Sequence, residues 1–176
     1  MDTTTILETL HRADIPLHHA RSFRGAFPYD RLPPAPIRRF PAAFIVNTDP
    51  SDEPGTHWIA LFFPSHDVES EYFDSFGREC TNSRILNLLK KSNHQGRYRW
   101  NRVRLQDTFS TVCGHYCNSF IFARLSGLSM GEYVSLFPSV SLPSSHNGYE
   151  LNDIFVRKLH RSFFPREEKK VNKKKL

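Results

Sequence analysis

Two segments that lie far apart in the chain hold the residue types that thiol catalysis requires. The first contains His57 and, 17 positions later (74 − 57), Asp74; the second contains Gln106 and, 7 positions later (113 − 106), Cys113. A nucleophilic thiol needs a base that ionises it, the base needs an orienting carboxylate, and the tetrahedral intermediate needs a hydrogen-bond donor for its oxyanion. The sequence therefore predicts that both segments form one active site.

The position of Cys113 favours it as the nucleophile. It lies where an irregular loop passes into an apolar helix predicted over residues 114–126. A thiol at a helix N-terminus is close to unpaired backbone N–H groups and to the positive end of the helix dipole, and both stabilise the thiolate. Gly114 allows a substrate to approach the backbone closely. Cys117 lies one turn further into the helix and is interpreted as a small buried side chain.

Asp74 and His57 are the expected partners that activate this thiol. Asp74 interrupts an apolar strand predicted over residues 71–76, where an unpaired carboxylate would be costly. We therefore expect Asp74 to have a partner, and His57, at the start of the preceding strand, is the natural one, although a histidine there could also be a strand-edge residue. Asp67 and Glu69 are the alternative carboxylates, but they fall in a polar hairpin loop.

Two further residues near the thiol have weaker signals. Gln106 could donate its amide N–H to the oxyanion together with the backbone N–H of Cys113, or it could be a surface glutamine at the end of a strand. His115 is expected on the exposed side of the first helical turn. Cys113, His115 and Cys117 are not accompanied by zinc-type pairs elsewhere in the chain, so no metal site is predicted.

The order of the expected elements indicates an α+β domain, because strands gather in the first half of the chain with helices around them. Prolines are dense between residues 16 and 36, so this region is predicted as a loop without long regular structure. Apolar runs predict strands over residues 42–47, 57–63, 71–76 and 97–105. Apolar residues at helical spacing predict helices over residues 3–13, 84–92, 114–126, 129–137 and 151–163.

Composition limits the class of protein. With 176 residues, 39% hydrophobic and 13% aromatic, the chain fits one globular domain, taken as residues 1–165. No apolar run approaches the roughly 20 residues that a membrane helix needs, and the first residues lack the basic and apolar regions of a signal peptide. Cys80, Cys113 and Cys117 do not suggest a disulfide framework. We therefore expect an intracellular, reducing compartment and no membrane partner.

Residues 166–176 form a basic tail. They contain six Lys or Arg and two Glu, a net charge of +4, whereas the rest of the chain carries about +2 (18 basic minus 16 acidic). The tail is either a solvated, disordered end, or a basic segment that binds nucleic acid or serves as a nuclear-import signal.

The segments around the candidate site are residues 46–48, 55–58, 73–77, Gln106 and 113–114. Together they resemble the adenovirus protease family, the adenain-type cysteine peptidases, and similar proteases are encoded by adenovirus-like mobile DNA elements of the Maverick/Polinton kind. The resemblance covers roughly residues 3–126, and both spacings within the site are those expected for the family. The family often has Glu where this chain has Asp74, and either carboxylate can orient a histidine.

The resemblance implies a role for each of the four residues. Cys113 would be the nucleophile and His57 the general base, while Asp74 would orient the imidazole and Gln106 would donate to the oxyanion. The family fold is α+β, with a mixed sheet packed between helices and the nucleophile at the N-terminus of a central helix. It is shared in outline with the SUMO-specific proteases.

The resemblance also implies cleavage after a glycine in small, extended motifs of virion precursor proteins, in the host nucleus or the virion. Trp58, with Gly55 and Gly114, would bind substrate by narrowing the approach to the thiol, although Trp58 could equally be a core aromatic. Enzymes of the family are stimulated by DNA and by a short peptide. The basic tail is compatible with DNA, and Cys80 is the only spare cysteine that could receive a peptide activator.

Two other functions remain open. A protease that removes ubiquitin or a ubiquitin-like modifier would use the same four residues, because it also cuts after glycine. A basic nucleic-acid-binding protein with an accidental triad would use the Lys-rich tail. Against this last reading, the charge outside the tail is nearly balanced and no binding motif stands out.

Overall fold

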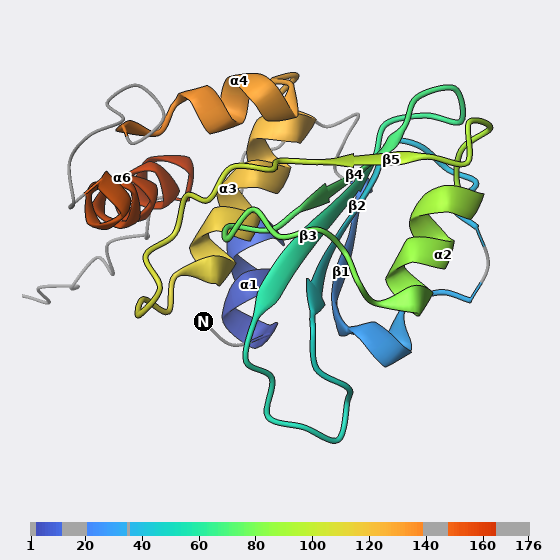
Figure 1. The fold of residues 1–176 in the computed structure, drawn as a ribbon, viewed down its shortest axis with the longest axis horizontal. Helices are drawn as coiled ribbons and strands as arrows, with labels where there is room; N and C mark the ends of the chain where they lie inside the picture. Colours follow the sequence, from blue (N-terminus) through green and yellow to red (C-terminus); the bar gives the residue numbers. More distant parts are fainter. Residues whose placement is uncertain (1–2, 12–20, 35, 139–147, 165–176) are drawn as a thin grey trace, which may run out of the picture.

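The computed structural model describes residues 3–11, 21–34, 36–138 and 148–164, and in these residues a five-stranded sheet lies between two layers of helices (Figure 1). In order across the sheet, the strands are β1 (Phe23–Pro28), β2 (Ala42–Asn47), β3 (Trp58–Phe63), β4 (Ser70–Phe73) and β5 (Tyr98–Trp100). The three central strands are antiparallel neighbours, while β1 and β5 each pair in parallel with the strand beside them. This mixed sheet is the fold class that the sequence predicts.

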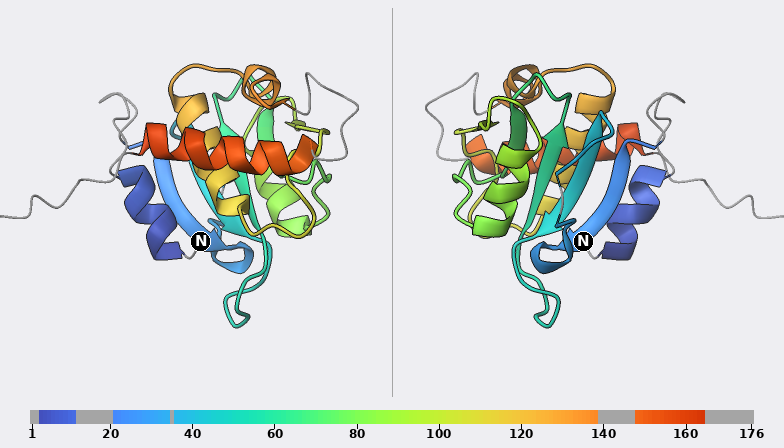
Figure 2. Two further views of the ribbon diagram at one scale, coloured as in Figure 1. Left: turned by 90° about the vertical axis from the view of Figure 1, so that its left-hand side faces the viewer. Right: turned by 90° about the vertical axis from the view of Figure 1, so that its right-hand side faces the viewer.

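Helices cover both faces of the sheet (Figure 2). They are α1 (Thr3–His11), α2 (Ser83–Lys91), α3 (Cys113–Leu125), α4 (Met130–Ser135) and α6 (Gly148–Phe163), with a short 3-10 turn η2 (Tyr29–Arg31). On one face α3 packs against β3, and α1, α4 and α6 contact α3 around it. On the other face α2 packs against β4 and contacts η2. None of the described helices is both long enough and apolar enough to span a membrane.

The sheet is buried on both sides, and this explains the apolar runs of its central strands. Ala60 packs with the layer that contains α3, and its neighbour Leu61 packs with the layer that contains α2, because successive side chains of a strand point to opposite faces. All residues of β2 and β3 are buried, as is typical of strands covered on both faces. The strands predicted over residues 42–47 and 57–63 are confirmed to within one residue.

α3 is the central helix that its sequence predicts. Ten of its 13 residues are buried. Phe120 stacks on Phe73 of β4, with ring centroids 4.5 Å apart, and Arg124 in the last turn bonds the buried carboxylate of Glu71, also in β4. Because the middle and the end of the helix are held against β4, its first residue, Cys113, has a set place relative to the sheet.

β1 lies inside the region predicted as a loop, so this prediction is wrong for residues 23–28. Gly25, at φ +126°, permits the irregularity in the pairing of β1 with β2. Pro28 comes only at the end of β1, where a missing N–H disturbs the ladder least. Prolines thus mark the end of an edge strand here rather than a continuous loop.

Two other strands are shorter than predicted. β5 covers residues 98–100 of the segment 97–105, and β4 ends at Phe73, so Asp74 follows the strand instead of interrupting it. The Asn101 side chain accepts a hydrogen bond from the backbone N–H of Asp74 and donates one to its carbonyl oxygen. These bonds satisfy the groups that a longer β4–β5 ladder would use, and both strands end there.

Some predictions concern residues outside the described ranges. These are the last two residues of the helix predicted over residues 3–13, part of the region 16–36, and the basic tail with the domain boundary that it sets. The remaining helix predictions, over residues 84–92, 114–126, 129–137 and 151–163, agree with α2, α3, α4 and α6 to within three residues at each end.

Candidate functional site

The start of β3 and the end of β4 place an imidazole beside a carboxylate. Because these strands are antiparallel, with Ala60 opposite Phe73, the residue before β3 and the residue after β4 meet at the same edge of the sheet. His57 Nε2 lies 2.7 Å from Asp74 Oδ1. The carboxylate is buried, with 2% of Asp74 exposed. The pairing that the sequence predicts for these two side chains is present in the structure.

The Asp74 carboxylate has little freedom to turn away from the imidazole. Its Oδ1 also accepts a hydrogen bond of 2.9 Å from the backbone N–H of Phe76. The Asn101 side chain holds the backbone of Asp74 from both sides, accepting from its N–H at 3.0 Å and donating to its carbonyl oxygen at 2.7 Å. Asn101 is not among the residues predicted for the site, and its signal in the sequence is a polar side chain in the middle of the strand predicted over residues 97–105.

The thiol completes the constellation. Cys113, the first residue of α3, is hydrogen-bonded to His57. Since Nε2 of this imidazole is bound to Asp74, Nδ1 is the ring nitrogen left for the thiol. The backbone N–H groups of Trp58 and Gly114 also donate to the sulfur. The fold thus brings an imidazole, a carboxylate and a thiol together from the ends of β3, β4 and α3.

These contacts decide the charge state of the pair. Burial by itself lowers the pKa of His57, but hydrogen bonds to Asp74 and Cys113 outweigh burial and raise the pKa from 6.5 to about 9. Burial by itself raises the pKa of Cys113, but hydrogen bonds from His57 and from backbone N–H groups outweigh it and lower the pKa below 9.0. Both shifts favour an imidazolium beside a thiolate, which is the reactive form of a cysteine nucleophile.

The other two cysteines are in unreactive surroundings. Burial raises the pKa of Cys80 to about 11 and the pKa of Cys117 well above its usual value. Cys117 is fully buried in the core, as its position inside the helix predicts. Cys80 is 5% exposed and packs with the α2 layer, and a buried thiol that stays protonated is a poor acceptor for a disulfide-linked activator.

Gln106 lies in the loop that leads to the thiol, and two hydrogen bonds hold its side-chain amide in place. The Ser75 hydroxyl donates to Gln106 Oε1 at 2.6 Å, and Gln106 Nε2 donates to the Ser110 carbonyl oxygen at 2.8 Å. The side chain is buried, with 1% exposed, so the alternative of a surface glutamine at a strand end is wrong. An amide nitrogen carries two N–H groups, and the bond to Ser110 uses one of them.

A cavity of about 600 Å³ lies against the β2–β3 hairpin, and its lining includes Gly55 and Trp58, the residues two before and one after His57. Trp58 is 8% exposed and packs in the same core cluster as Cys113, so it is a core aromatic and a cavity wall at once. Gly55 has φ +80°, and a Cβ there would lie 2.2 Å from Asn47 Nδ2. Only glycine fits this backbone, which passes directly over Asn47.

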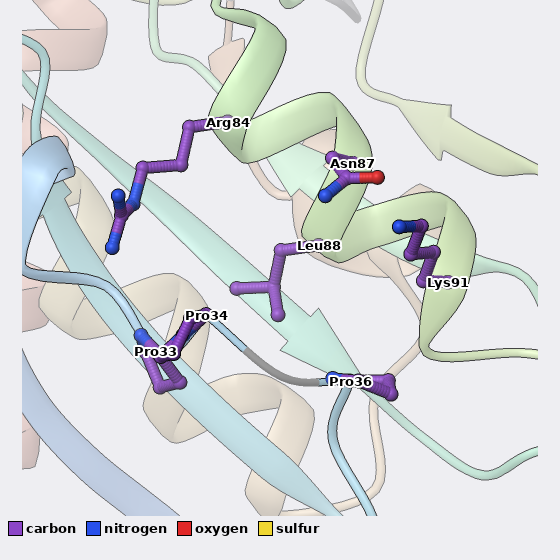
Figure 3. A pocket seen from close by; sticks show the side chains of 7 residues that line it. All are labelled: Pro33, Pro34, Pro36, Arg84, Asn87, Leu88 and Lys91. Atoms are coloured by element: carbon purple, nitrogen blue, oxygen red, sulfur yellow. The ribbon is translucent and has the colours of Figure 1, made fainter.

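A second cavity, of about 210 Å³, lies on the α2 face of the sheet (Figure 3). Arg84, Leu88 and Lys91 of α2 form one side of it, and prolines of the segment 33–36 form the other. None of the residues that the sequence predicts for the active site lines this cavity. It shares no lining residue with the cavity at the β2–β3 hairpin and is therefore separate from it.

His115 is not on an exposed surface, contrary to the sequence prediction. It is half-buried because α6 packs over the first turn of α3, and its ring centroid lies 4.6 Å from that of His160. Burial lowers the pKa of His115 to about 3, so the ring stays neutral. The helical periodicity could not reveal this, because the covering helix begins about 30 residues later in the sequence.

The chain is similar to a mimivirus protein in sequence and to the ASFV pS273R protease in structure. It is 32% identical over 115 residues to a protein of Acanthamoeba polyphaga mimivirus named "Putative thiol protease R355", and the match covers 61% of this chain and 37% of that protein. Its structure aligns with the crystal structure of the ASFV pS273R protease with a TM-score of 0.52 and 21% sequence identity, over 76% of this chain and 60% of the other. No protein-family model matches the chain.

These comparisons establish the fold and leave the activity to be tested. The likeness to the ASFV protease shows that the two chains share an α+β fold, as the sequence predicts. The chain spans less than two thirds of the length of either relative. Neither of them is an adenovirus protease, so the resemblance to that family stays a prediction from the sequence.

Proposed function

We propose that this chain is a cysteine peptidase in which Cys113 is the nucleophile, His57 the general base and acid, and Asp74 the residue that orients the imidazole. One observation carries the proposal: the imidazole is bonded on one nitrogen to a buried carboxylate and on the other to a thiol whose pKa is lowered. The match to a mimivirus protein named as a thiol protease and the fold shared with the ASFV protease support the same reaction.

The proposed peptide cleavage has two steps. First, the Cys113 thiolate attacks the carbonyl carbon of the scissile peptide, the C–N bond breaks, and the His57 imidazolium gives its proton to the departing amine. This leaves a thioester on the enzyme. Second, His57 takes a proton from water as the water oxygen attacks the thioester, and the sulfur leaves as thiolate beside the imidazolium. In both steps Asp74 keeps the ring oriented and stabilises its positive charge.

Gln106 and the helix N-terminus are the proposed donors for the oxyanion. Ser75 and Ser110 orient the Gln106 amide, which leaves its second N–H free of these two partners. The backbone N–H of Cys113 is among the first of α3, which lack a partner within the helix. Donors that are already in place cost no reorganisation when negative charge develops on the carbonyl oxygen.

The proposed substrates are virion precursor proteins cut after a glycine in a small extended motif. The viral origin of both relatives supports the substrate class. The surroundings of the thiol support glycine, because the nearly buried Trp58 lies close to the sulfur, to which its backbone N–H donates, and leaves little room there for a substrate side chain. Stimulation by DNA through the basic tail, and a location in the virion or the infected cell, belong to the same proposal.

Matched cysteine variants test the proposal. With quenched fluorescent peptides that contain Gly-Gly, Cys113→Ala should abolish cleavage while circular dichroism stays unchanged. Cys80→Ala, which removes a buried thiol on the other face of the sheet, should keep cleavage. Iodoacetamide at neutral pH should modify Cys113 first, as mapped by mass spectrometry. Cleavage by a folded Cys113→Ala variant would show that another group is the nucleophile.

The same geometry would serve an enzyme that removes ubiquitin or a ubiquitin-like modifier, because these modifiers also end in glycine. Fluorogenic ubiquitin and SUMO substrates distinguish the two functions. Robust turnover of either one that is lost in Cys113→Ala would identify a deconjugating enzyme. Cleavage of the Gly-Gly peptides without turnover of the modifiers would support the precursor peptidase.

A further inference from the structure

The cavity against the β2–β3 hairpin has a mixed lining with a single charged side chain among the described residues. Prolines and Trp58 supply apolar surface, Asn47 and Ser51 supply polar groups, and Glu53 is the only charged side chain among the described residues that line it. A cavity of about 600 Å³ is large enough for a long side chain of a bound peptide. Its composition therefore indicates which side chain it would accept.

The hairpin that carries Glu53 is anchored at its base and at its tip. At the base, the backbone N–H of Thr48 donates to the carbonyl oxygen of His57 at 2.9 Å. At the tip, the Ser51 hydroxyl donates to Asp30 Oδ2 of η2 at 2.7 Å. This hairpin, between β2 and β3, extends from the edge of the sheet (Figure 1). Glu53 thus lies on a loop held in place relative to the imidazole, as selective binding requires.

Negative charge dominates this hairpin. Residues 48–56 contain three carboxylates, Asp49, Asp52 and Glu53, and neither Lys nor Arg. Arg31 reaches the hairpin through Ser51, but it also lies 3.8 Å from a carboxylate oxygen of the neighbouring Asp30. The hairpin is thus acidic on a chain whose net charge is +6.

We infer that this cavity is a substrate subsite that selects a lysine or arginine side chain a few residues from the scissile bond, with Glu53 as the specificity-determining residue. The aliphatic stem would lie on the prolines and Trp58, and the charged head would meet Glu53. Because Trp58 lines this cavity and its backbone N–H is bonded to the Cys113 sulfur, an extended peptide bound at the thiol reaches the cavity within a few residues. The inference rests on the proposed peptidase function.

Peptides that differ in one charge test the inference. In a Gly-Gly peptide, each position near the cleavage site is replaced in turn by Lys, norleucine or Glu, and kcat/KM is measured. At one position Lys should exceed norleucine by about three- to fivefold, the range of a solvent-exposed ion pair, and Glu should be the poorest. Glu53→Gln should remove this preference and Glu53→Lys should reverse it in favour of Glu. The preference should also weaken as salt is added.

Asp52→Asn is the matched control. Asp52 is exposed on the same hairpin but does not line the cavity, so its replacement should leave the Lys-to-norleucine ratio unchanged. The inference fails if the wild type shows no preference for Lys at any position, or if Asp52→Asn alters the ratio as much as Glu53→Gln does. If the wild type cleaves no Gly-Gly peptide at all, the proposed peptidase function fails instead.

Discussion

His57 is the residue on which the reactivity of the site depends, because it contacts both other members of the constellation. Its Nε2 is bound to Asp74, and its remaining nitrogen is directed at Cys113. Each contact stabilises a positive charge on the ring, and the ring in turn stabilises the thiolate. The two titrations are therefore coupled, and the apparent pKa values belong to the pair.

This coupling predicts a bell-shaped pH profile for kcat/KM. Activity should rise as pH increases through the lowered pKa of Cys113, because the thiolate forms there. It should fall as pH increases through about 9, because His57 then loses the proton that the leaving amine needs. Initial rates measured from acid to alkaline pH check this. In Cys113→Ser, the pKa of His57 measured by NMR should drop below about 9, and a flat profile with chemistry rate-limiting would refute the pairing.

Replacing the orienting carboxylate should separate its role from mere packing. Asp74→Asn should reduce kcat by about 10³-fold or more, because a neutral amide neither holds the ring as the carboxylate does nor stabilises its charge. The pKa of His57 should fall for the same reason. Asp74→Glu should restore part of the activity. Equal kcat values for Asp74→Asn and the wild type would contradict the assigned role.

At the scale of elements, the site exists because three elements each have one terminus at the same edge of the sheet. β3 begins after His57, β4 ends before Asp74, and α3 begins at Cys113. Asn101, after the end of β5, joins this group by bonding the backbone of Asp74 in both directions. We regard Asn101 as a positioning residue, since it acts on the imidazole only through Asp74.

Asn101→Ala should affect the position of Asp74, and through it His57, as well as the stability of the fold. Asn101 is 7% exposed. Its loss leaves the N–H of Asp74 without this partner, while the C=O keeps its bond from the Gly77 N–H, at a cost of about 1–3 kcal/mol in the free energy of unfolding. The pKa of His57 should decrease and kcat should fall more than KM changes. Urea denaturation, NMR titration and kinetics measure the three effects. Lower stability with wild-type kcat and pKa would limit Asn101 to a structural role.

At the scale of the whole molecule, a buried carboxylate ties the sheet to the central helix. Glu71 is fully buried and accepts hydrogen bonds from Arg124 of α3, at 2.7 and 3.0 Å, and from Arg99 of β5. Arg124 also lies over the ring of Phe62, 4.5 Å from its centroid. This network fixes the end of α3 opposite to Cys113, and so contributes to the placement of the whole helix.

Glu71 and its exposed partner Arg99 should differ in their importance for stability. Glu71→Ala should lower the free energy of unfolding by about 3–5 kcal/mol, because it removes the partner of a buried charge. Arg99→Ala should cost at most about 1 kcal/mol, because the Arg99 side chain is 45% exposed, whereas that of Arg124 is 11% exposed. Urea denaturation of both variants gives the comparison. If both variants lost a similar free energy of unfolding, the stabilisation would come from the exposed Glu71–Arg99 pair and not from the buried Glu71–Arg124 pair.

The sequence by itself determined the features that local chemistry controls. Runs such as 42–47 and 57–63 are apolar enough to be read as buried strands, and the helix after Cys113 is apolar on nearly every side. A carboxylate among apolar residues must find a partner, which pointed to His57 and Asp74. These conclusions need only the pattern of residues within one element and the cost of burying a charge.

Tertiary structure decided what depends on contacts between distant elements. β1 forms only because β2 offers an edge to pair with, and His115 is half-buried only because α6 packs over it. The acidic cavity likewise needs the β2–β3 hairpin, η2 and α1 to meet. No local pattern encodes such encounters, because burial, pairing and pKa are set by neighbours that the chain brings together only when it folds.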